Sequence, residues 1–292
     1  MPPDGDGWLH CALGHRHWGL FGAAGLLAHR GGGASREILL QHRAEWSHHG
    51  GTWGLLGGAR HHEESAVDAA LREAAEEAGL RATDVRVQAR SDDDHGGWSY
   101  RTVVAVARTD LAPFVLNGES AEVAWWPVDR LPEPLHPGFA AAWPVLRTAL
   151  EPIRVVVDMA NVMGSRPDGW WRDRAAAAGR LLAAINAPAV RGVADEVLPP
   201  ELPRPRLQHW WPEFTLVLEG AARDAAASAL LAPGVSLSLA RGHGDDTIVK
   251  EAARWPGQRV LVVTADRELR GRCESVGATT VGPRWLLDLT ST

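Results

Sequence analysis

The most informative part of the 292-residue sequence is residues 58–80, which read GARHHEESAVDAALREAAEEAGL. Ser65 and Asp68 have the spacing of a helix capping box, in which a side chain satisfies the free N–H groups at a helix start. Gly79 is suited to the left-handed conformation that commonly follows the last helical residue. We therefore expect an alanine-rich helix from Ser65 to Ala78, flanked by strands on both sides.

Three glutamates share one face of this helix, because Glu73 precedes Glu76 by three residues and Glu77 by four. Like charges at this spacing repel one another unless a partner compensates them. A divalent cation such as Mg²⁺ prefers carboxylate and water oxygens, and Arg72 can pair with Glu64 or Glu73. An ordinary solvated acidic face is the alternative, but the complete spacing of the segment favours a metal site.

The segment resembles the signature of the Nudix hydrolase family, G-x5-E-x7-R-E-U-x-E-E-x-G-U, in which U is apolar. Every fixed position is present, and Ala74 and Leu80 occupy the apolar positions. Leu56 stands where the family often has proline, which removes no ligand. The resemblance covers about residues 17–150 and implies an α/β/α sandwich with a mixed sheet.

The resemblance also implies a nucleotide pyrophosphohydrolase, which cleaves a nucleoside diphosphate joined to another group or a nucleoside triphosphate, normal or oxidised. It implies Mg²⁺, or alternatively Mn²⁺, as the cofactor. The implied ligands and catalytic residues are Gly57 (through its carbonyl), Arg72, Glu73, Glu76 and Glu77. Further candidates are Glu64, Glu119 and Glu122 as additional carboxylates and Gly58 and Trp53 at the substrate. Trp53, like Trp98 and Tyr100, either stacks on a base or belongs to the sheet core.

The net charge and the pattern of strands and helices both change near Glu151. Residues 1–152 have a net charge of −7 and residues 153–292 a net charge of +1. Apolar, β-branched runs predict strands in the first part at 20–28, 37–41, 85–90, 100–107 and 123–128, and a second helix at about 138–150, started or kinked by Pro144. We expect two domains, 1–151 and 152–292.

In the second part, strands and helices alternate, which predicts a parallel sheet covered on both faces. The expected strands are 153–157, 215–218, 235–239 and 259–264, and the expected helices are 171–185, 245–254 and 266–276. The proline-rich stretch 188–212 is expected to be a long irregular connection.

Acidic residues follow each of these strands: Asp158, Glu219, Asp245 with Asp246, and Asp266. Asn161 lies three residues after Asp158. Because open parallel sheets bind ligands at the carboxyl ends of their strands, we expect these side chains to converge around one or two divalent cations. The alternative for Asp245 and Asp266 is helix N-capping.

Residues 153–290 resemble the NYN branch of the PIN-like nuclease fold, in particular YacP-like domains. The motifs that carry this resemblance are Asp158 with Asn161, GDD at 244–246 and TAD at 264–266. The resemblance implies a three-layer α/β/α domain, a metal-dependent ribonuclease activity and RNA as partner. Neither half has the strongly basic balance of a high-affinity nucleic-acid binder, which leaves activity in this half open.

Other features exclude some classes of protein. The longest apolar stretch, 19–28, is about half the length of a membrane-spanning helix, and no secretory signal is evident. Cys11 and Cys273 lie in opposite halves, which favours a reduced cytoplasmic compartment without disulfides. His10, Cys11, His15 and His17 offer zinc ligands, but a single cysteine without a second pair of ligands gives no zinc assignment.

A competing hypothesis is a nucleotide sensor, in which the first domain binds without cleaving and regulates a non-catalytic RNA-binding second domain. The intact set from Arg72 to Glu77 disfavours it, because a pure binder does not need the full metal site. A third hypothesis is that the two halves share a chain without coupling.

Overall fold

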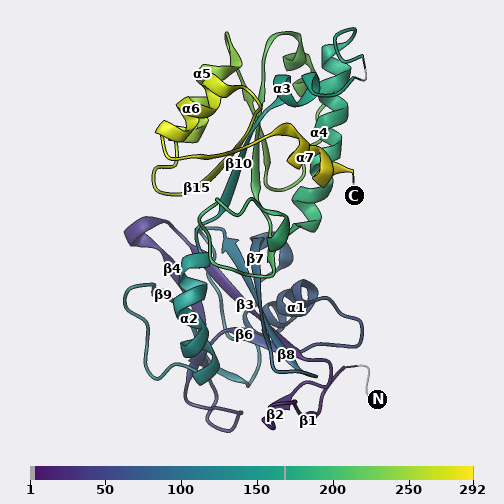
Figure 1. Ribbon diagram of the computed structural model, residues 1–292. Helices are drawn as coiled ribbons and strands as arrows, with labels where there is room; N and C mark the ends of the chain where they lie inside the picture. The colour runs from purple at the N-terminus through teal and green to yellow at the C-terminus, as the bar shows by residue number, and fades with distance from the viewer. Residues whose placement is uncertain (1–3, 168, 292) are drawn as a thin grey trace. The chain divides into compact units, whose positions relative to one another are not determined.

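The computed structural model describes residues 4–167 and 169–291 of the chain (Figure 1). Contacts divide it into two compact units, the first being Met1–Leu150 with Pro205–Gln208 and the second Glu151–Arg204 with His209–Thr292. Within the described ranges, no helix is both long and apolar enough to span a bilayer. Cys11 and Cys273 are both buried free thiols.

The first unit is built on a mixed sheet, as expected. Its central strand β3 (Ala23–Arg30) pairs in parallel with β8 (Ser99–Ala107) and antiparallel with β4 (Glu37–Arg43) and β6 (Leu56–Ala59). The other strands of this unit are β5 (Trp53–Gly54), β7 (Val85–Asp94) and β9 (Ser120–Pro127); β5 and β9 pair antiparallel with β4, and β7 pairs antiparallel with β8. A separate hairpin of β1 (Trp8–His10) and β2 (Arg16–Trp18) precedes this sheet and was not predicted.

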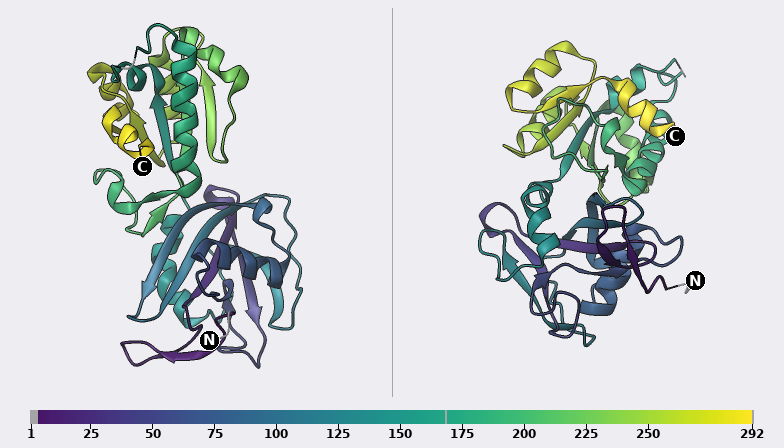
Figure 2. Two further views of the ribbon diagram at one scale, coloured as in Figure 1. Left: turned by 90° about the vertical axis from the view of Figure 1, so that its right-hand side faces the viewer. Right: turned by 60° about the horizontal axis from the view of Figure 1, so that its bottom comes forward.

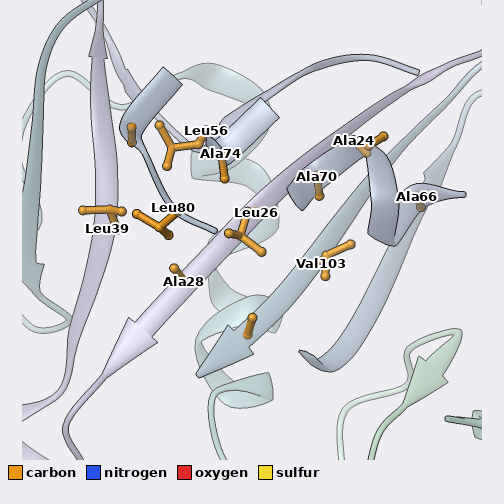
Figure 3. Packing of buried hydrophobic residues seen from close by; sticks show 13 residues of the cluster. Ala24, Leu26, Ala28, Leu39, Leu56, Ala66, Ala70, Ala74, Leu80 and Val103 are labelled. Carbon is orange, nitrogen blue, oxygen red and sulfur yellow. The ribbon is translucent and has the colours of Figure 1, made fainter. Parts of the chain in front are cut away.

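Helix α1 (Ala66–Ala78) packs on β3, β6 and β8. Its predicted limits are confirmed: the Ser65 side chain accepts a hydrogen bond from the Asp68 N–H at 3.1 Å, and Gly79 has a φ of 70°. Alanines on the helix allow close approach to leucine and valine side chains of the strands, among them Leu26 and Val103 (Figure 3). This tight packing fixes the helix that carries the three glutamates.

Helix α2 (Pro137–Ala149) lies on the face of the sheet opposite to α1. Val87 of β7 packs in the α1 cluster, whereas the Nε2 of the next residue, Gln88, donates to the Ala149 carbonyl at 2.7 Å. Pro144 lies inside α2 and does not begin it. The short 3-10 helices of this unit are Gly33–Ser35 and Ala82–Asp84.

Strand β3 starts at Ala23 and not, as expected, at residue 20. Gly19 and Gly22 have φ values of 100° and 84°, which are incompatible with a regular strand. The turn they form takes up the first residues of the apolar run 19–28, so the strand begins after Gly22.

The second unit contains a parallel sheet in the order β14-β13-β10-β15-β16, which confirms the predicted parallel arrangement. The strands are β10 (Ile153–Asp158), β13 (Glu213–Leu218), β14 (Val235–Leu239), β15 (Arg259–Val263) and β16 (Thr279–Val281). Helices α5 (Gly244–Ala253) and α6 (Arg267–Ser275) cover one face. The other face carries α3 (Met159–Gly164), α4 (Arg174–Arg191) and α7 (Pro283–Thr290), with α4 running along the strands (Figure 2).

Two expectations for the second unit are wrong in detail. Helix α4 continues through Pro188, so the irregular connection starts later than predicted. The helix continues because its buried side chains extend across the proline: Leu181, Leu182, Ile185 and Ala189. The helices α3 and α7 were not foreseen. The remaining elements are the antiparallel pair β11 (Val193–Ala194) and β12 (His209–Trp210) and the 3-10 helices Asp195–Val197 and Gly220–Ser228.

Candidate active site

Two glycines of β6 let strand and helix meet at the candidate site. A Cβ atom on Gly57 would lie 2.3 Å from the Ala24 carbonyl oxygen, and one on Gly58 would lie 2.6 Å from Glu73 Oε1. Any larger residue would therefore push β6 away from β3 or displace the Glu73 carboxylate. The glycines at the start of the segment are explained by this close approach.

Arg72 holds the loop between β6 and α1 against the helix. Its Nε and Nη2 contact the two oxygens of Glu64 at 2.9 and 3.0 Å, and Nη2 donates to the Ala59 carbonyl at 2.9 Å. Burial alone would raise the pKa of Glu64, but the hydrogen bonds from Arg72 and the His61 N–H hold it below its ordinary value. Glu64 is therefore a charged anchor for Arg72.

The same guanidinium reaches two of the helix glutamates. Arg72 Nη1 contacts Glu73 Oε1 at 2.8 Å and Glu76 Oε2 at 3.2 Å. Burial raises the pKa of Glu73, and the charges of Glu76 and Glu119 add to the rise, although Arg72 opposes it. Glu119 thus lies close enough to the site for its charge to act on Glu73.

Glu77 is almost fully buried, with 1% of its surface exposed. Its carboxylate accepts hydrogen bonds from the Gly57 N–H at 2.8 Å and from Gln41 Nε2 at 3.2 Å. Ser120 Oγ in turn donates to Gln41 Oε1. Burial raises the pKa of Glu77 to about 8, and the charge of Glu73 contributes to the rise. Gln41 and Ser120 are site residues that sequence reasoning missed.

The donor set fits a hard divalent cation. The half-buried Glu73 and the buried Glu77 are neighbouring carboxylates, both with raised pKa values, and a cation between them would compensate the repulsion. In the described ranges these glutamates do not bring three oxygens within 4.8 Å of one another, and Glu76, whose side chain is 57% exposed, is the one free to turn from Arg72. Gly57, which the resemblance implied as a ligand through its carbonyl, contacts Glu77 through its N–H.

Other sequence candidates lie elsewhere. Trp53 is 7% exposed and packs on His42 and Trp126, so of the two interpretations, base stacking and sheet core, its burial supports the core. Trp98 stacks on a histidine ring outside the helix site. Glu122 is exposed on β9, opposite His42, whereas the charge of Glu119 contributes to the raised pKa of Glu73.

Comparison with known proteins identifies the family. Residues 20–148 match the model of the NUDIX domain. The chain is 50% identical over 157 residues to "Putative 8-oxo-dGTP diphosphatase 3" of Mycobacterium tuberculosis, a match that covers 50% of this chain and 70% of that protein. The chain belongs to the Nudix family.

Two further proteins are similar to the same part of the chain. A Bifidobacterium longum "Nucleoside triphosphate pyrophosphatase/Nudix hydrolase fusion protein" is 40% identical over 153 residues, covering 50% of this chain and 32% of that protein. The crystal structure of a Nudix hydrolase from M. smegmatis, RenU, is 47% identical, with a TM-score of 0.45; it covers 49% of this chain and 93% of that chain. Nudix hydrolases generally use a divalent metal cation.

The second unit, beyond the Nudix match, has an acidic pocket of about 510 Å³ at the carboxyl ends of its parallel strands. Its lining includes the predicted residues Asp158, Asn161, Glu219, Asp245 and Asp266. Burial raises the pKa of Asp158, and the charges of Asp245 and Glu219 add to the rise. The convergence expected from the sequence is therefore present for these five side chains.

Hydrogen bonds hold the pocket residues in place. Asp158 accepts from the Asn161 N–H at 3.0 Å and from Thr264 Oγ1 at 2.8 Å, while Asn161 Oδ1 accepts from the Ala265 N–H at 2.9 Å. Glu219 Oε2 accepts from the Gly244 N–H at 2.6 Å.

One pocket prediction is wrong, and the capping alternative holds only in part. Asp246 is absent from the pocket lining; it pairs with Arg272 on the surface, because consecutive helical residues point in different directions. Asp266 is the N-cap of α6, as the alternative proposed, but His243 and not Asp245 is the N-cap of α5.

Proposed function

We propose that the Nudix unit, residues 1–151, hydrolyses a nucleoside triphosphate to the monophosphate and pyrophosphate, with an oxidised purine nucleotide as the preferred substrate. The observation that carries the proposal is the arrangement on α1, where Arg72 contacts Glu73 and Glu76 and the charge of Glu73 acts on the buried Glu77. The printed name of the 50% identical mycobacterial relative supports the choice of substrate.

In this proposal Glu73, Glu76 and Glu77 hold Mg²⁺, which supplies charge neutralisation for the phosphates and a more acidic water. Arg72 orients the carboxylates while Glu64 keeps its guanidinium in place. Gln41 and the Gly57 N–H fix Glu77, so its oxygens need no rearrangement when the phosphates arrive. Glu119 is proposed as a further carboxylate, acting from the loop before β9.

A nucleotide panel tests this function. We expect the full chain with Mg²⁺ to release pyrophosphate from 8-oxo-dGTP, with kcat/KM at least about tenfold above that for dGTP, because a site that hydrogen-bonds a group of its substrate rejects the analogue lacking that group by at least such factors. Products separated by anion exchange give the bond that is cleaved. Hydrolysis of only nucleoside diphosphate derivatives would contradict the substrate assignment, and no hydrolysis at all would contradict the function.

For the second unit, residues 152–292, we propose a PIN-like, metal-dependent ribonuclease domain. The supporting observation is the pocket in which Asp158, Glu219, Asp245 and Asp266 lie together at one sheet edge. Several carboxylates in one polar pocket suit one or two divalent cations, which can clamp a scissile phosphodiester. Asn161 positions Asp158 and the loop at Ala265 through its backbone and side chain.

Substitution in the pocket tests this second function. Asp158→Asn should abolish Mn²⁺-dependent cleavage of single-stranded RNA, because it removes a buried ligand charge. Asp246→Asn, outside the pocket on the same unit, should cleave like the unmodified chain. The ribonuclease proposal fails if the unmodified chain cuts no RNA with either Mg²⁺ or Mn²⁺, or if Asp158→Asn cuts at an unchanged rate.

A further inference from the structure

A cluster of one cysteine and three histidines lies in the first unit and shares no residue with the glutamate site. One donor atom each from Cys11, His15, His17 and His95 lies within 4.8 Å of all the others. A thiolate with three imidazoles is a donor set that zinc prefers. In a tetrahedral zinc site of one sulfur and three nitrogens the ligand atoms are about 3.3–3.6 Å apart, so the widest separation has to close by at most about 1.5 Å.

The hairpin of β1 and β2 supplies three of the four residues. Leu9 pairs with His17 across the hairpin. The turn between the strands is closed by the Cys11 N–H, which donates to the His15 carbonyl at 3.0 Å, and by the Gly14 N–H, which donates to the Cys11 carbonyl at 2.9 Å. The turn thus brings Cys11, His15 and His17 to one end of the hairpin.

His95 comes from the turn between β7 and β8, far away in the sequence. The Ala12 N–H donates to the Gly96 carbonyl at 2.8 Å, which joins the two turns through their backbones. His95 Nδ1 then lies 3.1 Å from His17 Nε2. This fourth residue explains why the sequence alone gave no zinc site: the amino-terminal cluster lacks a ligand that only the fold provides.

The surroundings of the cluster are those of metal-bound histidines. The second ring nitrogen of His95, Nε2, lies 3.2 Å from Asp93 Oδ2. A carboxylate behind a ligating imidazole is the usual means of fixing its ring orientation and raising its basicity. The His17 ring stacks on Trp98, with 3.9 Å between the ring centroids and 7° between the ring planes, and this stacking fixes the orientation of the His17 imidazole. Cys11 is 6% exposed, so its sulfur faces the cluster and not bulk solvent.

We propose that Cys11, His15, His17 and His95 form a structural zinc site that fastens the β1–β2 hairpin to the turn between β7 and β8. Four protein ligands complete a tetrahedral shell, which distinguishes a structural site from a catalytic one with an open position. His10, exposed on β1 beside Cys11, is not part of the group.

Cobalt substitution tests the site without relying on activity. The full chain is stripped with a chelator, supplied with excess Mg²⁺ to occupy carboxylate sites, and titrated with Co²⁺. We expect one equivalent to produce tetrahedral d–d absorption and a thiolate-to-cobalt charge-transfer band, and one equivalent of Zn²⁺ to remove both. Carboxylate sites contain no sulfur and cannot give the charge-transfer band.

Three variants locate the bound ion. Cys11→Ser should lose the charge-transfer band, and His95→Gln should weaken Co²⁺ binding by about tenfold or more, because one ligand and its carboxylate partner are lost. His10→Gln is the matched control and should titrate like the unmodified chain. Circular dichroism verifies that each variant folds.

Absence of a charge-transfer band in the Co²⁺ titration of the unmodified chain would overturn the proposal. A band that persists in Cys11→Ser would place the ion on Cys273 and would also overturn it, as would a His95→Gln titration identical to that of the unmodified chain.

Discussion

Replacing Glu76 by Gln should slow nucleoside triphosphate hydrolysis by about 10²- to 10⁴-fold, the range in which loss of a charged catalytic group falls. Glu76 is an exposed helix residue whose contact within the site is the edge of Arg72 at 3.2 Å. Such a surface ion pair contributes less than about 1 kcal/mol to stability, so the fold should persist while the cation loses a ligand. Steady-state kinetics with saturating Mg²⁺ measure the effect.

Glu63→Gln is the matched control, because Glu63 is an exposed glutamate of the loop before the same helix. It should hydrolyse the substrate like the unmodified chain. Unchanged turnover in Glu76→Gln, or an equal loss in both variants, would show that the carboxylate face of α1 does not take part in hydrolysis.

Replacing Asp195 by Ala should destabilise the second unit by about 3–5 kcal/mol, the cost of leaving a buried charge without its partner. Arg204 Nε contacts Asp195 Oδ1 at 2.7 Å, and the Arg204 side chain is only 1% exposed. Trp210 Nε1 also donates to Asp195 Oδ1, at 3.0 Å. Urea unfolding followed by circular dichroism measures the shift in the transition of this unit.

An exposed pair in the same unit provides the comparison. Asp246 contacts Arg272, but the Asp246 side chain is 83% exposed. Asp246→Ala should therefore change the free energy of unfolding by less than about 1 kcal/mol. Equal losses from the buried and the exposed aspartate would show that burial of Arg204 does not decide the stability.

Local sequence signals predicted the helix of the active site. Ser65 and Gly79 act through hydrogen bonds and φ angles within a few residues, so the limits of α1 follow from the sequence. The apolar runs of the second unit gave the parallel sheet, because strands buried on both faces require them. Strand ends then placed Asp158 and Asp266 at one edge.

Features that depend on distant residues did not follow from the sequence. Gln41 reaches Glu77 across 36 positions, and no local pattern marks it. His95 joins Cys11 and His17 only because two turns share a backbone hydrogen bond. The sequence left Trp53 with two interpretations, base stacking and sheet core, and the strand pairing around it determines that it is buried.

The dependence of hydrolysis on Mg²⁺ tests most directly whether the glutamates of α1 and a cation make the active site. The full chain is stripped with EDTA, dialysed, and assayed for pyrophosphate release from a nucleoside triphosphate while Mg²⁺ alone is added back. We predict no turnover without the ion and full recovery with it. Turnover that continues at the original rate in the stripped protein would contradict this account.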